Sequence, residues 1–380
     1  MKIAFLCPDA LSTKIFSQSF SEFFSKQKDV DFYTLSPVSS HEDYDYLNKV
    51  NSTHIPIKLT RFLNIFSDIF FMFNLYSITK KHNFDYVFTF TTKPNLLGPL
   101  PAYFAGASVF ICVRGLGRLF NNPNSFAARF LKIGYYISSY FANKVWVTND
   151  LDYNHLKNSK IPVKKFIKTK NAINLNEFKQ SNVSLDSISL FRNTYGIQED
   201  DFVVLLVGRL IWSKGIREFV EASSILSAKH PDIKFLLVAP QEKGSPDSVP
   251  LNYISDWNNC SQNNIWIDGL SNIKLAYVVS SLSVLPSYYS EGGYPRALLE
   301  AMSFGLPIIG GDTELCRGPV YEGVNGYLTP VKDSIALANK VQLIYENSKL
   351  YSNLSKGSLK IIKTDFDDNN VVRHIVSYLR

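Results

Sequence analysis

The chain has 380 residues, of which 46% are hydrophobic and 19% are charged. This composition excludes a disordered or fibrous protein, and the length predicts two domains of about 150–200 residues each. The net charge of +7 is uneven, because residues 1–180 carry 22 Lys and Arg against 12 Asp and Glu, whereas residues 181–380 carry 18 against 21. The first half also holds 22 of the 28 Phe residues. A basic, aromatic half indicates a partner of its own, although positive charge can also serve solubility alone.

The four cysteines lie far apart, with no C-x-x-C pair and no histidine at metal-ligand spacing. We therefore expect neither disulfides nor structural zinc, and free thiols fit a reducing, cytoplasmic compartment. The N-terminal apolar run is too short for a secretory signal and is predicted to be a first strand. Residues 96–113 lack charge over 18 positions, but two prolines and two glycines interrupt them. We predict a short helix and a buried strand there instead of a membrane span.

Short apolar runs alternate with longer helical stretches along the chain. The predicted strands are residues 3–6, 30–35, 85–90, 109–113, 145–148, 202–207, 234–238, 265–267, 282–286 and 307–310. The predicted helices include residues 15–26, 61–81, 215–229, 295–304 and 336–347. This alternation is typical of α/β proteins, in which parallel sheets are covered by helices on both faces.

A polar, serine-rich run over residues 180–192 marks the expected domain boundary. We predict a Rossmann-like N-terminal domain over 1–180, a Rossmann-like C-terminal domain over 181–365, and a last helix over 366–380. Doubly wound sheets bind ligands at the carboxyl ends of their strands, and two such domains facing each other would enclose a cleft. Neither half has G-x-G-x-x-G after its first strand, which argues against a nicotinamide or flavin cofactor.

One segment that follows the predicted strand 282–286 has the chemistry of a phosphate and sugar site. Its residues are Glu291, Gly292, Gly293, Tyr294 and Pro295, and the helix that Pro295 can open carries Glu300. Backbone amides at a helix N-terminus favour a diphosphate, and carboxylates accept hydrogen bonds from sugar hydroxyls. We therefore expect Glu300 to bind ribose and Glu291 a sugar. The alternative is that Glu291 complements the helix dipole and that Glu300 lies on a solvated face.

A second segment leads from the predicted strand 202–207 through Gly208, Arg209 and Lys214 into a helix. A guanidinium and an ammonium at the carboxyl end of a strand suit a diphosphate leaving group, whose negative charge grows in the transition state. The alternative is that Arg209 and Lys214 are two surface bases in a loop.

Together these strings resemble glycosyltransferase family 4, the retaining, nucleotide-sugar-dependent transferases of the GT-B fold, in its bacterial surface-polysaccharide type. Further matching strings are Gly305-Leu-Pro307, Cys316-Arg317, Glu322-Gly-Val-Asn-Gly326, Thr92-Lys-Pro94, Gly115-Leu-Gly117 and Asn171-Ala-Ile-Asn174. The resemblance covers nearly the whole chain and is specific in the second half and loose in the first.

The resemblance implies roles for these residues. Arg209 and Lys214 would hold the donor diphosphate, Glu300 the ribose hydroxyls, and Glu291 the donor sugar. Gly208 and the amides of residues 292–294 would line the donor site, and Gly269 and Leu270 would cradle the base. Transfer would proceed by front-face displacement, without a protein nucleophile and without a metal or other cofactor. Asp-x-Asp strings such as those at 29–31, 43–45 and 150–152 are short enough to arise by chance.

The sequence departs from the family pattern in both halves. Eight residues separate Glu291 from Glu300, where the family usually has seven. The family's glycine-rich loop after the first strand is absent, and Arg114 stands where many members carry histidine, before Gly115 and Gly117. Arginine stays protonated and cannot act as a general base. We expect acceptor binding near Arg114, Gly115 and Gly117, where the guanidinium can bind an acceptor phosphate or pair with a carboxylate.

The implied partners are a nucleotide sugar, with UDP favoured by the resemblance, and a polyprenyl-diphosphate-linked or other glycan acceptor in capsule, O-antigen or exopolysaccharide synthesis. Two stretches, 61–81 and 125–136, are aromatic and basic, which suits either domain core or contact with an anionic membrane at the inner face of the cell membrane. Dispersed bases without a recognition motif argue against nucleic acid. A nucleotide-sugar epimerase and a non-catalytic scaffold partner are the alternatives on the same fold.

Overall fold

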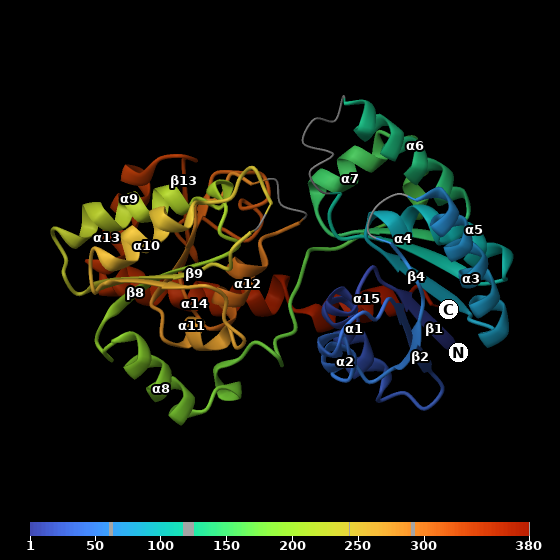
Figure 1. The fold of residues 1–380 in the computed structure, drawn as a ribbon, viewed down its shortest axis with the longest axis horizontal. Coiled ribbons are helices and arrows are strands. Elements are labelled where there is room, and N and C mark those ends of the chain that lie inside the picture. The colour runs from blue at the N-terminus through green and yellow to red at the C-terminus, as the bar shows by residue number, and fades with distance from the viewer. Residues whose placement is uncertain (61–63, 117–124, 243, 290–292, 380) are drawn as a thin grey trace. The chain divides into compact units, whose positions relative to one another are not determined.

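The computed structural model describes residues 1–60, 64–116, 125–242, 244–289 and 293–379 (Figure 1). The chain divides into two compact units. The first unit comprises residues 1–174, Gly293 and the C-terminal residues from Asp368, and the second comprises residues 175–289 and 294–367. The serine-rich run that we expected at the boundary lies near the start of the second unit, which begins at Leu175, and overlaps α8 (Leu185–Tyr195).

The first unit is built on a seven-stranded sheet in the order β3-β2-β1-β4-β5-β6-β7, and every pairing is parallel. Its strands are β1 (Lys2–Leu6), β2 (Asp31–Ser36), β3 (Thr53–Pro56), β4 (Tyr86–Phe90), β5 (Ser108–Val113), β6 (Lys144–Val147) and β7 (Phe166–Lys168). Central strands such as β1, β4 and β5 are almost continuously apolar because helices bury both of their faces.

Two layers of helices cover this sheet. Its helices are α1 (Ala10–Phe24), α2 (His41–Leu47), α3 (Ile65–His82), α4 (Thr92–Leu97), α5 (Pro99–Phe104), α6 (Phe126–Tyr140), α7 (Asp150–Lys157) and α15 (Asp368–Val376). One face holds an aromatic core in which the Phe5 ring lies 4.8–4.9 Å from those of Phe20, Phe32 and Phe88, beneath α1 and α15. The other face packs against α3, α5 and α6 through residues such as Phe71 and Tyr135.

The second unit has a six-stranded parallel sheet in the order β10-β9-β8-β11-β12-β13. Its strands are β8 (Phe202–Val207), β9 (Ile233–Val238), β10 (Asn264–Ile267), β11 (Leu282–Leu285), β12 (Ile308–Gly311) and β13 (Gly326–Thr329). Besides α8, its helices are α9 (Ile216–Ser227), α10 (Leu251–Asn259), α11 (Lys274–Val278), α12 (Arg296–Ser303), α13 (Ser334–Tyr345) and α14 (Ser348–Asp365). The predicted pair of doubly wound α/β sheets is confirmed, and the strand order of the second reverses between β8 and β11.

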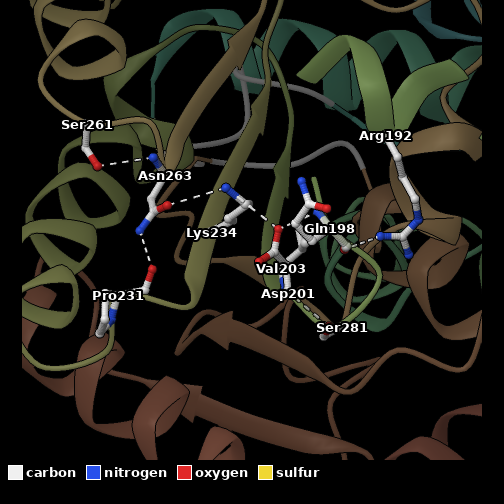
Figure 2. A network of polar contacts seen from close by, with 9 residues as sticks. All are labelled: Arg192, Gln198, Asp201, Val203, Pro231, Lys234, Ser261, Asn263 and Ser281. Carbon is white, nitrogen blue, oxygen red and sulfur yellow. Dashed lines mark hydrogen bonds and ion pairs between the residues drawn. The ribbon is translucent and has the colours of Figure 1, made fainter. Parts of the chain in front are cut away.

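A polar network joins the loops at the amino ends of these strands, at the edge of the sheet opposite their carboxyl ends (Figure 2). The buried Lys234 Nζ at the start of β9 lies 3.7 Å from Asp201 Oδ2, before β8, and 3.4 Å from Asn263 Oδ1, before β10. Asn263 Nδ2 in turn donates to the carbonyl of Pro231 at 2.6 Å. Because a buried ammonium needs partners, this network fixes the three loops that precede β8, β9 and β10.

Among the described residues, no helix is both long and apolar enough to cross a membrane. The stretch 96–113 forms the end of α4, then α5 and β5, which is the helix and strand that we predicted in place of a span.

Candidate active site

The loop after β8 carries the two cations that the sequence singled out. Gly208 leaves the strand, and a Cβ at this position would lie 3.6 Å from Cγ and Cδ of Lys214, so the lysine side chain runs along the glycine. Lys214 ends a single 3₁₀ turn, η4 (Trp212–Lys214), and is only 9% exposed. The interpretation of Lys214 as a solvated surface base is therefore wrong.

The loops after β8 and β11 form one hydrogen-bonded structure. The carbonyl of Ser213 accepts hydrogen bonds from the backbone amides of Tyr288 and Tyr289, both at 2.9 Å, and from Ser287 Oγ at 3.1 Å. Gly215, in the left-handed region at φ 82°, allows this approach, because a Cβ there would lie 2.5 Å from Pro286 Cγ. These two loops meet at the point where the strand order reverses, which is where doubly wound sheets bind ligands.

Tyr289 brings Arg209 and Lys214 together. Its ring centroid lies 5.0 Å from Arg209 Cζ and 5.1 Å from Lys214 Nζ, so one aromatic ring serves two cations. Arg209 Nη1 also lies 3.0 Å from Glu242 Oε1. Burial opposes the charge of Arg209, but Tyr289 and Glu242 outweigh it and raise the pKa of the guanidinium. Both cations are therefore held beside one ring, where they can bind a diphosphate.

Glu300 is buried on α12, with 8% of the residue exposed. Tyr277 donates its hydroxyl hydrogen to Glu300 Oε2 at 3.0 Å, and Arg296 Nε lies 3.3 Å from Oε1. Burial raises the pKa of Glu300, while Arg296 and Tyr277 oppose that change. The solvated-face alternative is therefore wrong for this residue. Each carboxylate oxygen has a second lone pair, so Glu300 keeps the capacity to accept hydroxyl hydrogen bonds.

The loops after β9 and β10 lie at the same edge of the sheet. Asp268 accepts hydrogen bonds from the backbone amide and the side-chain amide of Gln241, both at 2.8 Å, and so joins the two loops. Gly269 follows in the left-handed region at φ 82°, and Leu270 is half-buried beside it. The structure thus places the two residues expected at the base on the carboxyl edge that also carries Arg209 and Lys214.

The glutamate segment is described only in part. Glu291, Gly292 and, in the other half of the chain, Gly117 lie outside the described residues. Gly293 belongs to the first unit, where a Cβ would lie 2.1 Å from Asn171 Nδ2. Tyr294 packs its ring over Gly318 and lies 6.0 Å from the ring of Phe366. Pro295 precedes α12 and does not open it, since the helix begins at Arg296.

Arg114 and Gly115 lie in the first unit, directly after β5. The Arg114 guanidinium carbon lies 5.4 Å from the Phe16 ring centroid and 5.3 Å from that of Trp146. These two rings position the Arg114 side chain, and the contacts could not be predicted from the sequence because Phe16 and Trp146 come from distant segments.

The aspartates of two Asp-x-Asp strings have structural roles. Asp43 caps α2, Asp150 pairs with Lys168, and Asp152 accepts from the Leu116 amide at 3.3 Å. Within the ranges that the structure describes, no three His, Cys, Asp or Glu side chains gather closely enough to hold a metal ion.

Comparisons with known proteins agree with this geometry. Residues 187–360 match the family model described as glycosyl transferases group 1. The chain is 25% identical over 98% of its length to N,N'-diacetylbacillosaminyl-diphospho-undecaprenol alpha-1,3-N-acetylgalactosaminyltransferase of Campylobacter jejuni, covering 96% of that protein. It is 26% identical to UDP-Gal:alpha-D-GlcNAc-diphosphoundecaprenol alpha-1,3-galactosyltransferase of Escherichia coli, over 87% of this chain and 83% of that one.

The crystal structure of Anabaena HepE in complex with UDP superposes with a TM-score of 0.81 at 17% identity, covering 100% of this chain and 99% of HepE. The two doubly wound units and this likeness define the fold as that of the GT-B glycosyltransferases. The chain is a glycosyltransferase, and its residues 187–360 match the family model of the glycosyl transferases group 1.

Proposed function

We propose that this chain transfers a hexose or N-acetylhexosamine from a UDP-linked donor to a glycan carried on a polyprenyl diphosphate, with retention of anomeric configuration. The observation that carries the proposal is the placement of both Arg209 and Lys214 beside the ring of Tyr289 at the β8–β11 switch point. Two cations fixed before the reaction begins stabilise the charge that develops on a departing diphosphate, without reorganisation at that moment.

The remaining donor contacts follow from the positions along the same edge. Glu300 accepts hydrogen bonds from the ribose hydroxyls, and the base lies by Gly269 and Leu270. The role of Glu291 at the donor sugar rests on the family resemblance alone. The diphosphate held by Arg209 and Lys214 takes the proton of the incoming acceptor hydroxyl on the face from which it departs, so the new glycosidic bond forms on that same face. No metal is required, because the two cations supply the positive charge at the phosphates.

The acceptor part of the proposal rests on the relatives from Campylobacter jejuni and Escherichia coli, whose names both specify an undecaprenol-linked diphosphate. An acceptor with a polyprenyl tail stays in the bilayer, so the enzyme works at the cytoplasmic face of the cell membrane in surface polysaccharide assembly. The first unit, with its excess of Lys and Arg, receives this acceptor, and Arg114 with Gly115 lies at its phosphate. The family resemblance adds Gly117 to this acceptor site.

The proposal is tested by incubating the purified chain with UDP-sugars, one at a time, and a polyprenyl-diphosphate-linked monosaccharide. We expect one donor to give a disaccharide product whose new linkage has the anomeric configuration of the donor, as read from the proton coupling constant. Conversion of the donor without acceptor would indicate an epimerase. Donor binding without turnover on any acceptor would indicate a scaffold partner, and an inverted product would contradict front-face displacement.

A further inference from the structure

The helix α3 is apolar on its outer side as well as on its inner side. Phe71 and Leu75 face the sheet and are fully buried. The opposite side carries exposed Ile65, Phe66, Ile69, Phe70, Phe73 and Tyr76, and Phe66 is 87% exposed. These positions recur at helical spacing and form one continuous face. In a helix that covers a soluble domain, this side would carry polar residues.

The helix α6 repeats the arrangement. Its inner side packs on the sheet through Leu131 and Tyr135. Its outer side carries exposed Phe126, Phe130, Ile133, Ile137 and Tyr140, at intervals of four and three residues, and Phe126 is 86% exposed. Two different helices of one unit therefore expose large apolar side chains in the same pattern.

The short helix α5 lies between these two helices and contacts both (Figure 1). Its exposed Tyr103 and Phe104 lie 5.8 Å and 5.9 Å from the ring of Phe141, at the end of α6. We call the exposed outer sides of α3, α5 and α6 the aromatic face. Among the described residues, every exposed phenylalanine lies on these three helices. A concentration of this kind on one side of a unit marks an interaction surface.

The charges on the aromatic face have a single sign. The three helices contain one acidic residue, Asp68, which is buried and lies 2.6 Å from Lys93 Nζ. The bases are Lys80 and Lys81 at the end of α3, and Arg129 and Lys132 on α6; the first three are exposed. A surface with exposed aromatic rings, exposed cations and no exposed acid is suited to the interface of an anionic membrane, where acyl chains meet negatively charged headgroups.

We propose that the aromatic face docks the first unit on an anionic lipid surface, with the Phe side chains of α3 and α6 inserted among the headgroups and the bases contacting lipid phosphates. This inference deepens the proposed function, because it names the surface through which an enzyme with a lipid-linked acceptor reaches its membrane. A protein partner with an apolar groove would not need a field of unbalanced positive charge across two helices, whereas an anionic membrane does.

The test measures binding of the full-length chain to vesicles by flotation, with neither donor nor acceptor present, so that it does not depend on catalysis. Vesicles of phosphatidylethanolamine and phosphatidylglycerol are compared with vesicles of phosphatidylcholine. One variant combines Phe66→Ser, Phe70→Ser and Phe73→Ser, and a second combines Phe126→Ser and Phe130→Ser. The matched control combines Leu185→Ser and Leu190→Ser, which remove two exposed leucines from α8 in the second unit.

We expect the wild type and the α8 control to float with the anionic vesicles. Each Phe variant should lower the ratio of bound to free protein by at least about tenfold, since that factor corresponds to less than one fully buried phenylalanine. A further variant, Lys80→Glu with Lys81→Glu, should weaken binding several-fold on anionic vesicles alone, and added salt should have the same effect on the wild type. This variant changes only exposed charges, so it also tests the inference if a Phe variant fails to fold.

Equal flotation of the wild type and both Phe variants would overturn the proposal, as would equal binding to neutral and anionic vesicles. Dimers of the wild type that become monomers in the Phe variants would show that a second copy of the chain covers this face. Transfer to a short-chain, water-soluble acceptor should be the same for the wild type and the Phe variants. If the wild type does not transfer sugar to the short-chain acceptor, the proposed function is contradicted. The proposed docking of the aromatic face on lipid would not be affected by that result.

Discussion

Replacing Glu300 with Gln should lower activity without lowering stability. Burial raises the pKa of Glu300, so the ionised carboxylate is less favourable in the folded chain than in the unfolded one. Glutamine keeps an acceptor for Arg296 and removes the buried charge. It would also lose the charged hydrogen bond that we propose to a ribose hydroxyl, which is worth about 1.5–3 kcal/mol and corresponds to a fall in kcat/KM of roughly ten- to hundredfold.

The effect of Glu300→Gln on stability should depend on pH with a defined sign. Because the folded pKa lies above the unfolded value, the wild type loses stability relative to the variant as pH rises through the folded pKa, and the two converge in acid below the ordinary value of 4.5. Glu300→Ala should instead lower the free energy of unfolding by about 1–3 kcal/mol, because it leaves the buried Tyr277 hydroxyl without its acceptor.

The assay pairs steady-state transfer with urea unfolding at several pH values, and Glu221→Gln, on the exposed side of α9, is the matched control. The control should match the wild type in both measurements. Wild-type kcat/KM in Glu300→Gln would refute the ribose role, and a large loss of stability at neutral pH would refute the argument from burial.

Three further outcomes follow from the same geometry. Tyr289→Leu should lower kcat/KM by about tenfold, because both cations lose the ring. Tyr289→Phe keeps the ring and loses only the hydrogen bond of the hydroxyl with Arg209, so its loss should be smaller; equal losses would refute the cation–π role. Gly215→Ala should lower the free energy of unfolding by about 2 kcal/mol or more, because of its left-handed φ and the clash of a Cβ with Pro286. Gly208→Ala, which has room for a Cβ, should lower it by less. Equal free energies of unfolding for the two variants in urea titrations would contradict this argument. Chelation by EDTA should leave transfer unchanged, and a loss restored by Mg²⁺ or Mn²⁺ would contradict the metal-free mechanism.

The central strands and the loops at their carboxyl ends could be predicted from the sequence, because a strand that is buried on both faces consists of a short run of apolar residues. The short outer strands β3, β7 and β13 were missed, since His54, Lys168 and Gly326 interrupt or shorten their apolar pattern. Such strands form because a neighbouring strand is available for pairing, which local sequence does not record.

Some residues of the candidate site could likewise be predicted from the sequence, and others could not. Arg209 and Lys214 could be found because they directly follow an apolar run, whereas Tyr289 could not, since its role depends on the contact between the loops after β8 and β11. The stretch now known as α3 was predicted to be either core or membrane-facing. One side of this helix packs on the sheet and buries Phe71, whereas the other side faces outward and exposes Phe66. The sequence alone could not show which side packs on the sheet.

The central claim is that a diphosphate binds between Arg209 and Lys214 at the β8–β11 switch point, and titration of UDP into the protein by calorimetry tests it most directly. Lys214→Ala should raise the dissociation constant of UDP at least about tenfold, the scale of one charged hydrogen bond, while Lys229→Ala, an exposed lysine just after α9, should leave it unchanged. Equal affinity of the wild type and Lys214→Ala for UDP would contradict the claim.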